Sequence, residues 1–130
     1  AAFEQLCCWI SAQGGDAAYL RDVRLFPTAP AYEVCATESG YIAGMDAERI
    51  GIVSVTLGGG RAKKEDAIDF AAGIRLLKKT GDAVVAGEPI AILYTNRAGA
   101  VEGAKAAYLD ALTISVAAPA PQELIYTVVR

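Results

Sequence analysis

Apolar residues recur three or four positions apart in three stretches of the chain, a spacing typical of helices with one buried face. The first stretch predicts a helix over residues 2–13 that stops at Gly14-Gly15. The second follows Asp46, a good N-cap, and predicts a helix over 47–57. Its β-branched residues would equally suit a strand, and we favour the helix. The third predicts a helix over 98–112.

Alternating apolar and polar residues mark most of the remaining chain, and this pattern is typical of strands with one buried face. We expect strands over 32–36, 41–45, 68–79, a short piece around Val84, 90–95, 113–116 and 124–129. Strands in local runs between a few helices indicate an α+β fold rather than a doubly wound sheet.

The N-terminal part differs from the rest. Asp16 can cap a short second helix with Leu20 and Val23 facing inward. It is followed by Pro27-Thr28-Ala29-Pro30, which predicts a linker because proline pushes the preceding residue toward extended geometry.

We therefore expect two parts: residues 1–30 are the end of a preceding unit with its linker, and residues 31–130 form the compact domain. The sequence begins inside a predicted helix and has no initiator methionine, so we expect a fragment of a longer protein.

Composition removes several functional classes. The 130 residues fit one domain, and a hydrophobic content of 54% indicates a packed core. A net charge of −3 argues against general affinity for nucleic acid. Apolar runs stay far below the ~20 residues of a membrane helix, and no secretion signal opens the sequence. We expect a cytoplasmic protein with neither nucleic acid nor membrane as a partner.

Side chains for catalysis are scarce. Histidine, the commonest general base and metal ligand, is absent. Cys7, Cys8 and Cys35 form no Cys-x-x-Cys pair, so we expect buried, reduced thiols and no metal site. Asp66 and Asp69 stand three apart and are expected to cap the first turn of a helix rather than to form a catalytic pair. No cofactor is expected.

The candidate site is the glycine-rich stretch from Gly58 to Asp69. It fails both phosphate fingerprints: Lys63 stands where a dinucleotide site needs its third glycine, and the Gly-Lys-Ser/Thr of a P-loop is missing. Two interpretations remain open. The stretch is either a solvated helix end whose cations complement the helix dipole, or a mobile loop that closes on a ligand held mainly elsewhere. Its candidate residues are Gly58, Gly59, Gly60, Arg61, Lys63 and Lys64.

Residues 81–90 resemble the hairpin turn of biotinyl and lipoyl carrier domains, a barrel-sandwich element with Val84 as its core anchor. A carrier would present a modifiable lysine at a hairpin tip. The sequence lacks the usual motif around any lysine, so a structural hairpin is favoured. The alternative hypothesis of a biotinyl- or lipoyl-like binding module predicts an adduct on Lys78, Lys79 or Lys105.

Together these motifs resemble the C-terminal part of the pyrimidine-nucleoside phosphorylases, the family that includes thymidine phosphorylase. The matching residues run in order along nearly the whole chain: Gly14-Gly15-Asp16, Ser39-Gly40-Tyr41-Ile42, Asp46-Ala47, Ile50-Gly51, Leu57-Gly58-Gly59-Gly60-Arg61-Ala62-Lys63-Lys64, Asp66, Ile68-Asp69, Lys78-Lys79, Gly81-Asp82, Gly87-Glu88-Pro89, Asn96 and Leu124-Ile125-Tyr126.

The resemblance implies an α/β-hammerhead domain preceded by a helix of the upstream α/β domain. It implies a parent enzyme that splits thymidine or uridine with phosphate, giving the free base and (deoxy)ribose 1-phosphate. The family's phosphate- and base-binding residues lie upstream, so no catalytic residue is expected in this fragment, which should be inactive alone. The resemblance further implies a homodimer formed through the missing N-terminal domain. The glycine-rich loop would help to close the substrate cleft.

Overall fold

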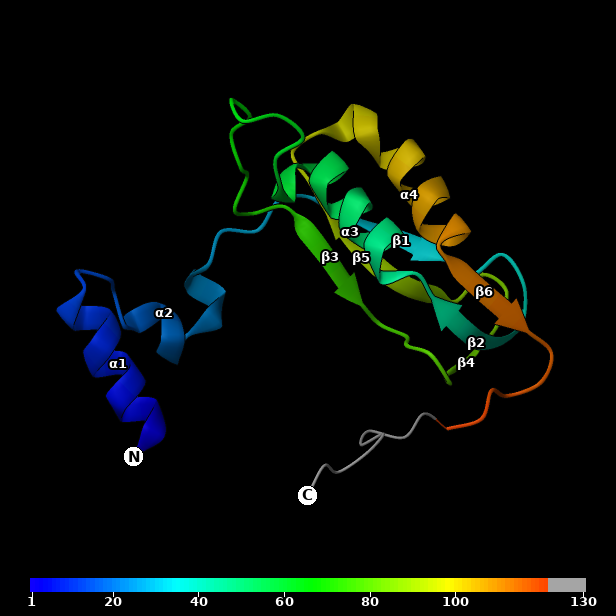
Figure 1. Ribbon diagram of the computed structural model, residues 1–130, viewed down its shortest axis with the longest axis horizontal. Helices are drawn as coiled ribbons and strands as arrows, with labels where there is room; N and C mark the ends of the chain where they lie inside the picture. Colours follow the sequence, from blue (N-terminus) through cyan, green and yellow to red (C-terminus); the bar gives the residue numbers. More distant parts are fainter. Residues whose placement is uncertain (122–130) are drawn as a thin grey trace, which may run out of the picture.

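A computed structural model describes residues 1–121 of the chain (Figure 1). In chain order its elements are the helices α1 (Ala2–Ala12) and α2 (Ala18–Arg21), the 3₁₀ turn η1 (Val23–Leu25), strands β1 (Ala31–Cys35) and β2 (Gly40–Met45), helix α3 (Ala47–Ser54) with its π-helical extension η2 (Val55–Gly59), strands β3 (Gly73–Leu76), β4 (Ala83–Val84) and β5 (Pro89–Tyr94), the 3₁₀ turn η3 (Ala98–Ala100), helix α4 (Val101–Asp110) and strand β6 (Leu112–Ser115). The strand predicted over 124–129 lies outside the described residues.

The strands form two three-stranded antiparallel sheets, ordered β1-β5-β3 and β4-β2-β6. Helices α3 and α4 lie side by side against them (Figure 1). This arrangement confirms the α+β class, with helices packed on open antiparallel sheets as expected for the hammerhead domain.

The core lies where the two sheets meet these helices. Its largest fully buried side chains are Tyr108, Ile42, Leu57, Ile90, Leu93, Val34 and Val53, each less than 2% exposed. Burying one such aliphatic or aromatic side chain contributes about 1.5–3 kcal/mol, so these residues dominate the stability of the domain. The predicted core anchor Val84 is confirmed, and Val34, Val53 and Leu57 belong to the same core.

Asp46 caps α3 as predicted, because its Oδ1 accepts a hydrogen bond of 3.0 Å from the amide of Arg49. The helical reading of this segment is therefore correct, and the β-branched residues Ile52, Val53 and Val55 did not convert it to a strand. Tertiary packing of the face that carries Val53 and Leu57 outweighs the lower helix propensity of the β-branched residues.

The strand predicted over 68–79 is wrong for most of its length, because β3 spans only Gly73–Leu76. Before it, Asp69 holds a turn: its Oδ1 accepts from the amide of Ala71 and its carbonyl from the amide of Ala72. After it, the amides of Leu77 and Lys78 both donate to the carbonyl of Ile90, which ends the regular ladder.

Two expectations about burial are also wrong. Val23 is 73% exposed rather than inward, since it lies in the short η1 turn beyond α2. Only Cys7 of the three thiols is buried. Cys8 is exposed on α1, and Cys35 is exposed because it follows the inward Val34 at an irregular position of β1.

The helices α1 and α2 lie apart from the two sheets, at the far end of residues 27–30 (Figure 1). They contact each other through an ion pair of 2.6 Å between Arg21 and Glu4, with the Arg21 guanidinium 5.7 Å from the centre of the Phe3 ring. Large apolar side chains remain exposed on this part, including Phe3, Trp9, Leu25 and Phe26. The boundary at residue 30 stays a prediction.

Candidate functional site

The glycine-rich stretch begins where helix α3 ends. The helix continues through η2 and stops at Gly58, whose φ of +111° lies in the region that favours glycine. Gly59 passes so close to the helix that a Cβ there would lie 2.9 Å from the Ser54 hydroxyl oxygen. These two glycines therefore let the chain leave the helix at once and turn tightly back beside it.

The two ends of the loop are joined. The carbonyl of Gly58 accepts a hydrogen bond of 2.9 Å from the amide of Asp69, so residues 59–68 form an excursion with a closed base. Within it, Asp66 Oδ2 accepts from the amides of Ala62 (3.0 Å) and Lys63 (2.8 Å). This carboxylate shapes the tip of the loop.

A turn that follows β5 holds the base of the loop. Tyr94 at the end of β5 pairs with Ala31 of β1 and with Gly73 of β3, so the chain leaves this strand between the starts of its two neighbours. The amide of Thr95 donates to the carbonyl of Pro30 (3.1 Å), which fixes the direction in which the next residues run. Residues 95–97 are thereby brought against the end of α3.

The carbonyls at the end of the helix are satisfied from this turn. The Thr95 hydroxyl donates to the carbonyl of Leu57 (2.6 Å), and Arg97 Nη1 donates to the carbonyl of Thr56 (3.3 Å). The same hydroxyl oxygen of Thr95 accepts from the amide of Arg97 (2.9 Å). Thr95 is fully buried, so its bond to Leu57 is shielded from water, and the bond from the Arg97 amide is partly buried.

Of the two interpretations of the stretch, the one in which Arg61, Lys63 and Lys64 complement this helix end gains no hydrogen bond to its carbonyls within residues 1–121. The cation that lies against the final carbonyls is Arg97, which a search of the local sequence misses because it stands 41 residues beyond Thr56. All three loop cations are exposed, and none forms an ion pair within residues 1–121. With the carboxylates of Glu65 and Asp66 in the same loop, residues 59–68 carry a net charge of +1.

Asp66 and Asp69 do not cap a helix, contrary to expectation, because the residues around them form turns and loop. Asp69 Oδ2 instead accepts from the side-chain amide of Asn96 (2.8 Å) and Oδ1 from the amide of Ala71 (2.9 Å). The hydrogen bond from Asn96, then that from Ala71, and the nearby charge of Arg97 hold the pKa of the Asp69 carboxyl below its ordinary value. Asp69 is therefore a charged anchor and a poor proton donor or acceptor at neutral pH.

Lys78 is placed differently from the modified lysine of a carrier domain. Lys78 Nζ lies 2.7 Å from Glu88 Oε1 and donates to the carbonyl of Ala83 (3.0 Å), with its side chain 26% exposed. These contacts hold the amine against the turn, and the bond from Lys78 lowers the pKa of the Glu88 carboxyl. Val84 of β4 is buried, as predicted, but β4 pairs with β2 and not with β5, so residues 81–90 form no two-stranded hairpin. This geometry favours the structural role.

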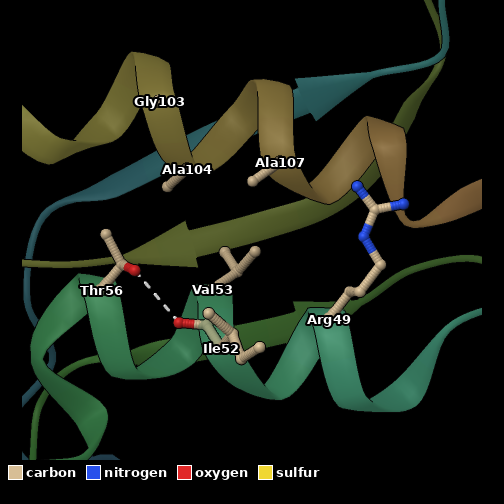
Figure 2. Close-up of a pocket in the computed structure, with 7 residues that line it drawn as sticks. All are labelled: Arg49, Ile52, Val53, Thr56, Gly103, Ala104 and Ala107. Carbon is tan, nitrogen blue, oxygen red and sulfur yellow. Dashed lines mark hydrogen bonds between the residues drawn. The ribbon is translucent and has the colours of Figure 1, made fainter. Parts of the chain in front are cut away.

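Helices α3 and α4 enclose a shallow groove of about 150 Å³ (Figure 2). It is lined by Arg49, Ile52, Val53, Thr56, Gly103, Ala104 and Ala107. The Thr56 hydroxyl points back to the carbonyl of Ile52 (3.1 Å), so it is not offered to a ligand. Sites for small organic ligands usually enclose about 300–1,000 Å³, so this groove is too small to hold a nucleoside.

Within the described part of the chain, no cluster of three or more His, Cys, Asp or Glu side chains could hold a metal ion. A search of the same residues finds no helix whose length and apolar character would let it cross a membrane. What the structure brings together is a cationic loop and the turn that holds it.

The sequence matches known proteins along its length. A family profile described as "Pyrimidine nucleoside phosphorylase C-terminal domain" matches residues 41–115. The pyrimidine-nucleoside phosphorylase of Bacillus subtilis (strain 168) is 42% identical over 130 residues, covering 98% of this chain and 29% of that protein. That of Geobacillus stearothermophilus is 37% identical over 126 residues, covering 96% and 29%. The chain therefore spans less than a third of the length of these relatives.

Proposed function

Because this chain belongs to the family of pyrimidine nucleoside phosphorylase C-terminal domains, we propose that it is the C-terminal part of a pyrimidine-nucleoside phosphorylase. The observation that carries the proposal is the identity of 42% over 98% of the chain to a protein of that name. The resemblance found in the sequence motifs is thereby confirmed. The parent enzyme would cleave thymidine or uridine with phosphate to the free base and (deoxy)ribose 1-phosphate.

The part played by this domain is closure of the substrate cleft. Phosphorolysis proceeds through an electron-deficient sugar carbon, at which water would compete with phosphate, so the cleft has to exclude water. The exposed cations Arg61, Lys63 and Lys64 stand on a glycine-flanked loop and are not paired inside residues 1–121. The loop has a net charge of +1 over residues 59–68, and its exposed cations would be attracted to a cleft that holds phosphate. The loop binds and closes, and the reacting groups lie upstream.

Residues 1–30 would complete the preceding unit of the same protein. The aromatic and aliphatic side chains exposed on α1, α2 and η1 need a covering surface, and Phe3, Trp9 and Phe26 are each about half exposed or more. The chain covers 29% of the Bacillus subtilis relative, so the remainder of such a protein is long enough to supply that surface. A homodimer formed through that upstream part, a cytoplasmic location and a reaction without any cofactor complete the proposal.

The proposal is tested with the full-length parent and the 130-residue chain side by side. The parent should release thymine or uracil from its nucleoside only when phosphate is present, and the 130-residue chain should release none. Phosphorolysis by the 130-residue chain alone would contradict the assignment of catalysis to the upstream part. A parent without activity on any pyrimidine nucleoside would overturn the proposed function.

The role of the loop is tested in the parent by the triple variant Arg61→Ala, Lys63→Ala, Lys64→Ala. Loss of the attraction should raise KM for phosphate or slow turnover, and the unfolding temperature should not change, because these side chains make no ion pair within residues 1–121. The matched control is Arg75→Ala with Lys79→Ala, which removes exposed cations from strand β3 and from the turn before β4. Kinetics equal to those of the control would show that the loop never approaches substrate.

A further inference from the structure

Three consecutive side chains, those of Thr95, Asn96 and Arg97, contact both ends of the glycine-rich loop. Thr95 and Arg97 bind the carbonyls of Leu57 and Thr56, just before the loop leaves the helix. Asn96 binds Asp69 on the other side, just after the loop returns. A single turn therefore joins two segments that are otherwise linked at this point by the hydrogen bond between Asp69 and Gly58.

The contacts differ in their shielding from water. Thr95 and Leu57 are fully buried, so their hydrogen bond forms a permanent part of the core. Asn96 and Arg97 are exposed, and their bonds to Asp69 and Thr56 lie at the surface beside the loop. The bonds from Thr95 and Arg97 hold the helix end, and the surface bond from Asn96 to Asp69 holds the point where the loop returns.

The fixed base matters because of where the cations stand. Arg61, Lys63 and Lys64 lie a few residues from Gly58, beyond three glycines that add little stiffness. With both ends held, the loop can move only as a flap about its base, and its charged tip reaches a limited volume. A base that opens would let the same charges spread over a larger volume and would weaken their effect at any one point.

We propose that Thr95, Asn96 and Arg97 are positioning residues that hold the base of the loop, so that its three cations meet the anionic substrate in one place when the cleft closes. The proposal rests on the proposed phosphorolysis. None of the three residues touches substrate in this scheme. Asn96 is the most informative of them, since its bond to Asp69 can be broken and rebuilt without disturbing the core.

The experiment reverses this bond. Asn96→Asp places a carboxylate against Asp69 and removes the donor. Asp69→Asn with Asn96→Asp restores it in the opposite direction, since the new amide at 69 can donate to the new carboxylate and still accept from Ala71. The matched control is Asp82→Asn, which weakens a similar turn away from the loop, where Asp82 Oδ2 accepts from the amide of Lys79 (2.7 Å).

Hydrogen exchange of the 130-residue chain gives the first readout and needs no catalysis. Asn96→Asp should speed exchange of the Asp69 amide about tenfold, because hydrogen bonds to charged groups are worth about that factor or more. The double variant should return the exchange rate of the Asp69 amide toward that of the unsubstituted 130-residue chain, and Asp82→Asn should leave this rate unchanged. Unchanged exchange in Asn96→Asp, with Asn96→Ala as a second variant should the first not fold, would overturn the proposal.

Kinetics of the full-length enzyme give the second readout. Asn96→Asp should lower kcat/KM for phosphate about tenfold, since misplacing a binding group by a fraction of an ångström has effects of that order. The double variant should recover it, which a purely structural role would not require. Faster exchange together with unchanged kinetics in an active enzyme would overturn the positioning role. An enzyme inactive before any substitution would overturn the proposed function, and the exchange data would still decide whether the turn holds the loop.

Discussion

Replacing Thr95 by valine tests the part of the site on which the loop base depends most. Valine has the same shape as threonine but carries a methyl group in place of the hydroxyl. The substitution removes the donor to the carbonyl of Leu57 (2.6 Å) and the acceptor for the amide of Arg97 (2.9 Å). Thr95 and Leu57 are fully buried, so water cannot replace the lost partner at the carbonyl.

The magnitude follows from the two orphaned groups. A buried polar group left without its partner costs about 1–3 kcal/mol, and the half-exposed Arg97 amide costs less because water reaches it. The gain from a buried methyl group offsets about 0.8 kcal/mol of this. Thr95→Val should therefore lower the free energy of unfolding by about 1–3 kcal/mol. Thr95→Ser keeps the hydroxyl and loses only a methyl group, so it should cost about 1 kcal/mol.

The assay is urea unfolding of the 130-residue chain followed by far-ultraviolet circular dichroism. Tryptophan fluorescence is unsuitable, because the single tryptophan, Trp9, lies on α1, apart from the domain under test. The two variants together separate the hydrogen bonds from packing. If Thr95→Val were as stable as the unsubstituted chain, the argument that this hydroxyl holds the helix end would be wrong.

Three further predictions concern single groups near the core and the loop. Tyr108 is fully buried and its hydroxyl has no hydrogen-bond partner among the described residues, so Tyr108→Phe should be neutral or raise the free energy of unfolding by up to about 2 kcal/mol; a loss in urea unfolding would reveal a partner. Gly58→Ala should lower the free energy of unfolding by about 1–2 kcal/mol, because Gly58 has a positive φ and a Cβ there would meet Arg97 Nε at 3.3 Å. Gly51 lies in open space on α3, so Gly51→Ala should raise the free energy of unfolding by about 0.5–1 kcal/mol. Equal effects of the two substitutions in urea unfolding would contradict this. The pKa of the Asp69 carboxyl is lowered in the folded chain, so its contribution to stability is present above the ordinary pKa of 3.8 and is lost as pH falls through the folded value. The difference in unfolding free energy between the unsubstituted 130-residue chain and Asp69→Asn should therefore shrink on acidification. A difference that stays constant with pH would refute the linkage.

Elements with a local signal were predictable. The capping carboxylate of Asp46 and the helical spacing of Val53 and Leu57 identified α3, although its β-branched residues pointed the other way. The glycines around Val84 marked the turns on either side of the short strand β4. These features depend on contacts between residues close in sequence, where propensity, capping and periodicity carry the information.

The site itself depended on contacts between distant residues. Thr95 lies 38 positions from Leu57, and Asn96 lies 27 positions from Asp69. Asn96 was recognisable only as one of the residues that match the family, and Arg97 carried no local signal at all. The strand predicted over 68–79 failed for the same reason, because the turn at Asp69 is stabilised by Asn96 from another part of the chain. Sequence pattern located the loop and missed what holds it.

The identity of the cation at the helix end changes how the loop charges are interpreted. If Arg61, Lys63 and Lys64 had lain against the carbonyls of Thr56 and Leu57, their charge would have been used within the domain, and the loop would have been a solvated helix end. Arg97 occupies that place instead, at 3.3 Å from the carbonyl of Thr56. The three loop cations therefore stay available to an external anion, held on a base that Thr95 and Asn96 keep closed. This separation of the structural cation from the exposed ones supports the proposed role of the loop in closure. Under that proposal, Arg97→Ala acts through the loop base, and the triple loop variant acts through phosphate alone.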